Sequence, residues 1–390
     1  MLSGIIKTGK RIGAAIVLLL LAVVGAEVWL QITTPPPVPT VCPQTTPEAQ
    51  PLLVPSATTH HELRRLTTLT LPNGEALRTN SLGLRGPEFD RESKQSLRVI
   101  MLGDETVLGL NHAEAQTLPS LLKRFLVKST GREVEVINAG VPGYAPVLSG
   151  IQFRQQLLSL KPDIVLLHFD MNDVADDSYY RRLLKTSDQT KICDHPLLQP
   201  RPPTAALRLS RQSALLRSIQ TALVESEQTA GEDDLVKRYR WTLPDSSDLR
   251  LPIQQALLPV TDLASVCSDQ NLPLLICSCP VPWQVAARNA FEDLARQLRN
   301  TNQWPVSNDL PNRILQAACN RCDALYCDAR TAFGTFQHPE ALYEGQSVQL
   351  SALGNSLYAR EIASTILTTP RVAGLFRTTT TAQTPTGNER

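Results

Sequence analysis

Short apolar runs that alternate with amphipathic segments restrict the fold of this chain more than any other sequence feature. The runs are nearly continuous in Val, Ile and Leu, as a strand buried on both faces requires. They are "LRVIMLG" (97–103), "EVEVINAG" (133–140), "PDIVLLHFD" (162–170), "LPLLICSCPVP" (272–282) and "ALYCDART" (324–331). Segments with helical spacing lie between and after them, at 117–129, 147–160 and 351–367. We therefore predict one α/β domain of three layers, α/β/α, with a parallel central sheet.

The charge balance of the chain excludes one class of partner. Lys and Arg number 38 against 37 Asp and Glu, so the sequence has no basic excess for a phosphate backbone. We expect no nucleic-acid partner.

The N-terminus predicts a membrane partner. Lys7, Lys10 and Arg11 precede the apolar run 12–32, which is about as long as a bilayer-spanning helix. We expect residues 1–11 to be cytoplasmic, 12–32 to be a single-span anchor and the rest to be extracytoplasmic. The alternative is a secreted protein, with a signal peptide cleaved near Gly25.

Composition shifts divide the remaining chain. Residues 33–59 are dense in Pro and Thr, which predicts an extended linker. Residues 60–375 would form the α/β domain, with 179–251 as a helical insertion that forms a lid or cap. The polar tail 376–390 is expected to be disordered.

Eight cysteines in an exported chain favour disulfides. The alternative is a zinc site at Cys319, Cys322 and Cys327, but the spacing offers no second close pair for a fourth ligand. We predict disulfides of unknown connectivity, no metal and no cofactor.

Polar residues follow three of the predicted strands, where parallel sheets bind ligands. They are "GDET", "NAGVPGY" and "FDMND", and "QSVQLSALG" follows later at 346–354. This order resembles the SGNH or GDSL hydrolases, a superfamily of esterases and acyl-hydrolases with a flavodoxin-like fold. The upstream "RTNSLGLRGPEF" (78–89) resembles a segment of exported, membrane-tethered members. The resemblance spans about Thr79 to Leu367 without the insertion.

The resemblance implies an oxyanion site with an altered nucleophile. Gly140 and Asn172 fall on the positions that donate a backbone N–H and a side-chain amide to the oxyanion, and Asp104 is kept. Glu105 falls on the nucleophilic serine. Its carboxylate would accept hydrogen bonds from Gly140 and Asn172 and fill the pocket itself.

The other two catalytic positions are altered as well. Gln346 falls on the triad aspartate and Gln349 on the triad histidine. A glutamine amide has no basic nitrogen, so it cannot act as the general base. His338 and His168 are candidate replacement bases, and Glu105 with Thr106 is a further base and nucleophile pair.

Three functions remain open at this point. The first is a membrane-anchored binding or scaffolding module of the cell envelope without serine-esterase activity. Its ligand class would be an acylated envelope glycan or another acylated molecule. The second is an active esterase or acyl-hydrolase with a non-standard catalytic set, which would cleave ester bonds such as the acetyl groups of envelope glycans. The third is a structural domain that contacts other envelope proteins.

Overall fold

The structure is a computed structural model. It describes residues 21–30, 40–71, 74–90, 96–187, 190–198, 213, 234–243, 247–298, 304 and 308–376. The chain divides into two units, each described here by itself. The smaller comprises Met1–Thr40 and Gln199–Glu232, and the larger comprises Val41–Leu198 and Asp233–Arg390.

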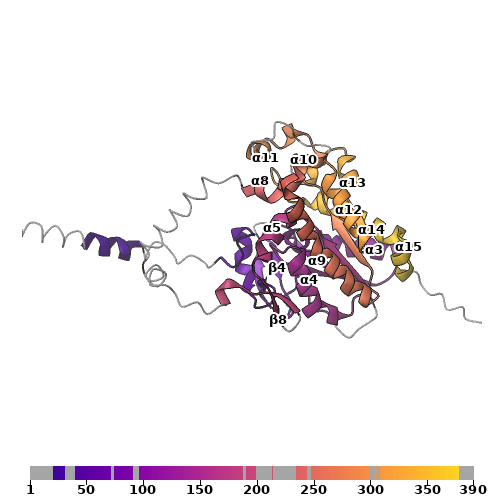
Figure 1. The fold of residues 1–390 in the computed structure, drawn as a ribbon, viewed down its shortest axis with the longest axis horizontal. Helices are drawn as coiled ribbons and strands as arrows, with labels where there is room; N and C mark the ends of the chain where they lie inside the picture. Colours follow the sequence, from indigo (N-terminus) through magenta and orange to yellow (C-terminus); the bar gives the residue numbers. More distant parts are fainter. Residues whose placement is uncertain are drawn as a thin grey trace, which may run out of the picture. The chain divides into compact units, whose positions relative to one another are not determined.

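A five-stranded parallel sheet forms the centre of the larger unit (Figure 1). Its strand order across the sheet is β11-β10-β7-β5-β6. If the five strands are numbered 1 to 5 along the chain, this is the 2-1-3-4-5 order of flavodoxin-like folds. The α/β class, the parallel sheet and the flavodoxin-like order are confirmed. The strands are β5 (Leu97–Gly103), β6 (Val134–Gly140), β7 (Ile164–His168), β10 (Leu274–Ser278) and β11 (Leu325–Asp328).

Helices cover the two faces of this sheet. On one face α3 (Leu118–Thr130) packs against α14 (Ala352–Thr368), and on the other α4 (Pro146–Gln152) packs against α9 (Arg250–Asp269). The remaining α-helices are α2 (Glu105–Leu108), α5 (Asp173–Arg181), α8 (Asp234–Tyr239), α10 (Pro282–Val285), α11 (Glu292–Gln297), α12 (Leu310–Arg321), α13 (Arg330–Gly334) and α15 (Pro370–Ala373).

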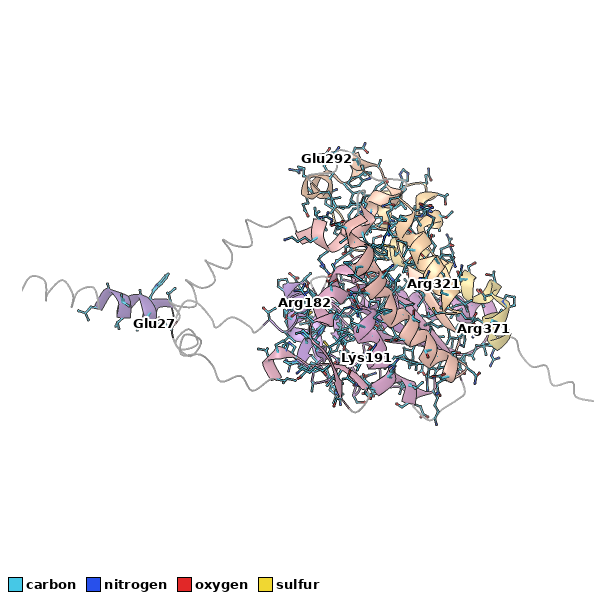
Figure 2. All side chains as sticks on the ribbon, viewed as in Figure 1. Glu27, Arg182, Lys191, Glu292, Arg321 and Arg371 are labelled. Carbon is cyan, nitrogen blue, oxygen red and sulfur yellow. The ribbon has the colours of Figure 1, made fainter. Side chains whose placement is uncertain are left out.

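The core and surface follow from the sequence pattern. Every residue of β5, β7 and β10 is buried, as expected for strands between two helix layers. Charged side chains such as Lys191, Arg321 and Arg371 are exposed (Figure 2).

The segment predicted as an extended linker is folded from Val41 onward. It forms the turn η1 (Pro47–Leu52) and the strand β1 (Leu53–Pro55), which pairs with β2 (His61–Leu63). A second hairpin joins β3 (Thr68–Thr70) to β4 (Ala76–Arg78). Cys42 and Leu52 are fully buried in a second hydrophobic cluster that includes residues of α4. The linker prediction is therefore wrong for 41–59, because the few apolar residues of this segment find partners far along the chain.

The predicted insertion is only partly described. Its first part continues α5 and forms the hairpin of β8 (Leu184–Ser187) and β9 (Thr190–Cys193). Residues 199–233 of this insertion lie outside the described part except for Ser213, and so does the tail from 377. A role as lid or cap stays a prediction.

In the smaller unit, residues 21–30 are helical, and the Ser213 hydroxyl donates to the Glu27 carboxylate. Residues 1–20 and 31–39 of the expected anchor region lie outside the described part. Among the helices that the structure describes, none combines the length and apolarity needed to cross a membrane.

All eight cysteines have free thiols, so the expected disulfides are absent. Seven of the thiols are buried and pack as small apolar side chains. Burial raises the pKa of Cys42, Cys193 and Cys267 to about 12.

Candidate functional site

The first strand of the sheet delivers Glu105 to the site. Gly103 ends β5, Asp104 is the N-cap of the short helix α2, and Glu105 is its first residue. One oxygen of the Asp104 carboxylate, Oδ1, accepts the backbone N–H of Thr106 at 2.9 Å. Local sequence thus fixes the turn by a capping hydrogen bond and leaves Glu105 half-buried above the sheet.

The Glu105 carboxylate binds a backbone amide from the second strand end. Its Oε2 accepts the N–H of Gly143 at 3.0 Å. Residues Val141 to Tyr144 form a β-turn closed by Tyr144 N–H to Val141 C=O, with Pro142 second and Gly143 third. Gly143 has φ +73°, the left-handed conformation that a type II turn needs at this position. Its N–H is not used by the turn and is available to Glu105.

Gly140 does not take the role expected of it. Its N–H donates to Asn138 Oδ1, and a Cβ here would lie 2.3 Å from the Leu108 nitrogen. Glycine is therefore required at 140 by the close approach of β6 to α2. The backbone N–H that faces Glu105 is instead that of Gly143, three residues later, and the Pro-Gly pair in the sequence was the signal for its turn.

Asn172 also bonds elsewhere than expected. Its Nδ2 donates to Asp176 Oδ2 at 3.2 Å, and its Oδ1 is buried without a hydrogen-bond partner. Arg238 holds the same Asp176 oxygen at 3.2 Å. The Asn172 amide thus lies at the end of the third strand, as predicted, but it donates to Asp176 and not to Glu105.

Gln349 and Glu105 lie on one pocket. The pocket has about 310 Å³ of empty space, open solvent at its mouth included, and its other polar side chains are those of Thr106, Asn111, His112 and Asn355. Asn111 Nδ2 donates to Gln349 Oε1 at 2.5 Å. The positions that resemble nucleophile and base therefore do converge.

Gln346 is exposed and points away from this pocket. It bridges to the loop before α11, where it donates to Ala290 C=O and accepts the N–H of Asp293. His338 is exposed on the surface beside Glu340, so the structure gives it no place as a replacement base. His168, the other candidate, is buried at the end of β7 with its Nδ1 2.9 Å from the Tyr358 hydroxyl.

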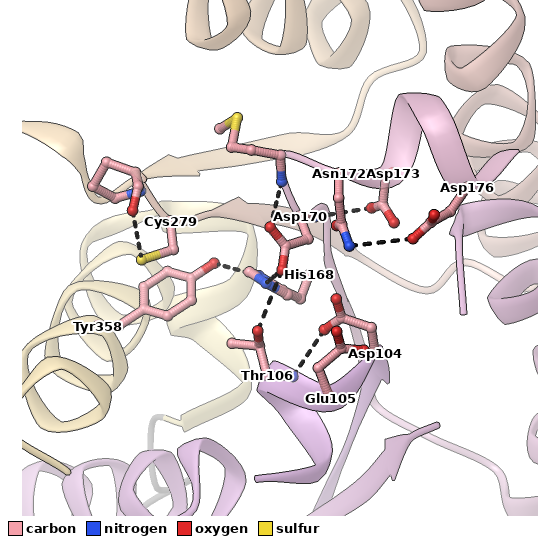
Figure 3. A network of polar contacts seen from close by, with 12 residues as sticks. Asp104, Glu105, Thr106, His168, Asp170, Asn172, Asp173, Asp176, Cys279 and Tyr358 are labelled. Atoms are coloured by element: carbon pink, nitrogen blue, oxygen red, sulfur yellow. Dashed lines mark hydrogen bonds and ion pairs between the residues drawn. The ribbon is translucent and has the colours of Figure 1, made fainter. Parts of the chain in front are cut away.

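Buried carboxylates crowd the strand ends behind Glu105 (Figure 3). Burial raises the pKa of Asp104 and of Asp173 well above its ordinary value, and neighbouring carboxylates raise both further. Burial also raises the pKa of Asp176 to about 7, against the attraction of Arg238. For Asp170 burial acts in the same direction, but the His168 side chain outweighs it and lowers the pKa to about 2. In the sequence, the signal for these buried carboxylates was the acidic residues of "GDET" and "FDMND" at the predicted strand ends.

The N-terminal segment supports the Gly143 turn. His61 Nε2 donates to Pro142 C=O at 2.8 Å, on the same peptide whose N–H binds Glu105. The Tyr180 hydroxyl donates to Gly143 C=O at 2.6 Å. Sequence reasoning missed these residues, because His61 stands just after the segment assigned to a linker and Tyr180 stands in the segment assigned to an insertion.

Among the comparisons with known proteins, only the comparison with solved structures finds proteins similar to this chain. No family model matches the chain, and no curated protein matches it. Similar solved structures include a lipase/acylhydrolase from Enterococcus faecalis, with 14% identity, coverage of 69% of this chain and 95% of that one, and a TM-score of 0.40. A lipolytic protein of the G-D-S-L family from Desulfitobacterium hafniense has 10% identity, 69% and 99% coverage and a TM-score of 0.38. The acetylxylan esterase Axe2 from Geobacillus stearothermophilus has 12% identity, 70% and 96% coverage and a TM-score of 0.39. The fold assignment itself rests on the strand order and motif order of this chain.

Proposed function

We propose that this chain is an SGNH-hydrolase-like protein whose pocket binds a ligand and does not carry out serine-type ester hydrolysis. One observation carries the proposal: the Glu105 carboxylate stands at the position that resembles the nucleophile and accepts the Gly143 N–H at 3.0 Å. That amide is the backbone donor which an oxyanion would need.

Two further features oppose hydrolysis. Gln349 cannot take a proton at neutral pH, and its amide oxygen is held by Asn111. The negative charge of Glu105 would also repel the anionic tetrahedral intermediate of acyl transfer. The serine, the histidine and the free amide donor of serine-type hydrolysis are thus all replaced or occupied at the positions that resemble them.

The same chemistry indicates which ligand the pocket accepts. Glu105 favours neutral or cationic groups over anions, and the side-chain amides of Asn111 and Gln349 suit hydroxyl and amide groups. With the N-terminal apolar run as a membrane anchor, the ligand class we propose is an acylated glycan of the cell envelope.

Hydrolysis of short-chain aryl esters by the purified full-length chain tests the proposal. We expect no turnover above buffer for the native chain, and measurable turnover for the triple variant Glu105→Ser, Gln346→Asp, Gln349→His. Glu105→Ser alone is the matched control and should stay inactive, because it lacks a base. Turnover by the native chain would overturn the proposal.

A second candidate is an active hydrolase with a different nucleophile. The Thr106 hydroxyl lines the pocket and lies 3.4 Å from Asp170 Oδ2, which lies 3.8 Å from His168 Nε2. Native turnover that Thr106→Val abolishes would establish this set in place of the first proposal.

A further inference from the structure

One cluster at the strand ends plays no part in the proposed function. Asp104, His168 and Asp170 come from the ends of β5 and β7, and one ligand atom of each lies within 4.8 Å of the other two. His168 and Asp104 are 3% and 2% exposed, so this group is sealed from water on most sides. Among the described residues, no other group of His, Cys, Asp or Glu gathers three potential metal ligands this closely.

In each carboxylate of the cluster, one oxygen accepts a backbone N–H and the other faces the remaining two side chains. Asp104 Oδ1 accepts the Thr106 N–H, and its Oδ2 is buried without a hydrogen-bond partner. Asp170 Oδ1 accepts the N–H of Met171 at 2.5 Å, and its Oδ2 faces His168 and accepts a long hydrogen bond of 3.4 Å from the Thr106 hydroxyl. Backbone amides thus orient both side chains toward a common point, as outer-shell partners orient metal ligands.

His168 presents an unpartnered nitrogen to the same point. Its Nδ1 lies 2.9 Å from the Tyr358 hydroxyl, and its Nε2 is buried with no hydrogen-bond partner, 3.8 Å from Asp170 Oδ2. Without an ion, Nε2 faces Asp170 Oδ2 as a basic group. With an ion bound, the proton would lie on Nδ1, donated to the Tyr358 oxygen, and would leave the Nε2 lone pair free for the metal. This is the tautomer that a metal-bound imidazole requires.

The charge of the cluster also calls for a cation. In the described part of the chain, no Lys or Arg forms an ion pair with Asp104 or Asp170. Buried carboxylates without a cation are costly, and a divalent ion between two of them would cancel their charge.

We propose that Asp104, His168 and Asp170 bind one divalent transition-metal ion, for which Zn²⁺ is the best match. One imidazole nitrogen and two carboxylate oxygens are ligands that Zn²⁺ takes, whereas Mg²⁺ and Ca²⁺ prefer oxygen alone. Ligands bound at about 2.1 Å lie about 3 to 4 Å from one another, so the cluster needs only a small contraction. This inference does not rest on the proposed function.

Metal titration of the purified full-length chain tests the site. After chelator treatment, Co²⁺ added as a spectroscopic probe should bind at one ion per chain with nitrogen and oxygen ligation, and Zn²⁺ should displace it. Asp104→Asn and His168→Gln should each weaken binding at least tenfold. Asp177→Asn is the matched control, because Asp177 is another buried carboxylate but pairs with Arg181 outside the cluster; it should bind as the native chain does.

Three results would overturn the proposal. They are no binding of either ion by the folded native chain, equal binding by the Asp104→Asn and native chains, and a thiolate charge-transfer band, which would assign the metal to cysteines. Circular dichroism identifies a variant that fails to fold, and the native titration then still decides. Ester turnover is not part of this readout, so failure of the metal site and failure of the proposed function are distinguishable.

Discussion

At the scale of single residues, the site depends on one peptide group held from both sides. The C=O of Pro142 accepts from His61 and the N–H of Gly143 donates to Glu105. Gly143 also has no room for a side chain, since a Cβ would lie 2.8 Å from the Cys42 sulfur. Glu105 therefore meets an amide whose direction is set by residues that never touch the pocket.

His61 should make stability depend on pH. Burial lowers the pKa of His61 from 6.5 to about 4, and that of His60 to about 3. The unfolded chain binds these protons first, so this stability is present above pH 6.5 and is lost as pH falls toward 4. From pH 7 to pH 5, His61 should contribute a loss of about 2 kcal/mol in the free energy of unfolding.

The comparison variant is His61→Gln, whose amide can still donate to Pro142 C=O. Urea unfolding at pH 7 and pH 5 should show a loss smaller by about 2 kcal/mol than in the native chain. Buried carboxyl groups with a raised pKa, such as Asp176, act in the opposite direction, because their contribution to stability falls as pH rises. They are present in both chains, so they cancel in the comparison. Equal losses in both chains would contradict a buried neutral His61.

At the scale of elements, a buried arginine fixes the helix that carries Glu105. Arg85 is 3% exposed and donates to the C=O groups of Leu108, Gly109 and His112, at 2.9, 2.6 and 2.7 Å. Leu108 is the last residue of α2, and Gly109 and His112 line the pocket. The planar guanidinium thus joins the upstream segment 78–89 to the site.

Arg85→Lys should lower the free energy of unfolding by about 2 to 3 kcal/mol, because an ammonium cannot reach three carbonyls from one position. Chemical denaturation measures the change. Arg124→Lys is the matched control: Arg124 is an exposed arginine that donates to one carbonyl, Ala115 C=O, and its replacement should change stability by less than about 0.5 kcal/mol. Similar losses in the two variants would show that Arg85 does not anchor α2.

At the scale of the whole molecule, the alternation of apolar runs predicted the sheet and the positions of its carboxyl ends. The resemblance to the SGNH hydrolases placed Glu105 and Gln349 at one site, and the pocket contains both. Parallel strands bring their ends to one edge whatever the side chains do there. This part of the architecture is therefore readable from local sequence.

The remainder depended on contacts between distant segments. Pro and Thr in residues 41–59 favoured a linker, but Cys42 and Tyr180, 138 residues apart, meet behind the Gly143 turn. Gly140 was predicted as the backbone donor from its position in the motif. The turn at Val141 to Tyr144 decides which N–H is free, and that N–H belongs to Gly143. Cysteine number likewise favoured disulfides, although burial alone accounts for seven of the eight thiols.

The Gly143 amide gives the most direct test of the central claim that Glu105 occupies the oxyanion donor. Pro142–Gly143 is the only Pro-Gly pair in the sequence, so labelling proline with ¹³C at the carbonyl and glycine with ¹⁵N yields one selected amide signal. Because Glu105 accepts this N–H, we expect the signal to shift in Glu105→Ala and to stay in place in Gln346→Ala. An unchanged signal in Glu105→Ala would contradict this claim.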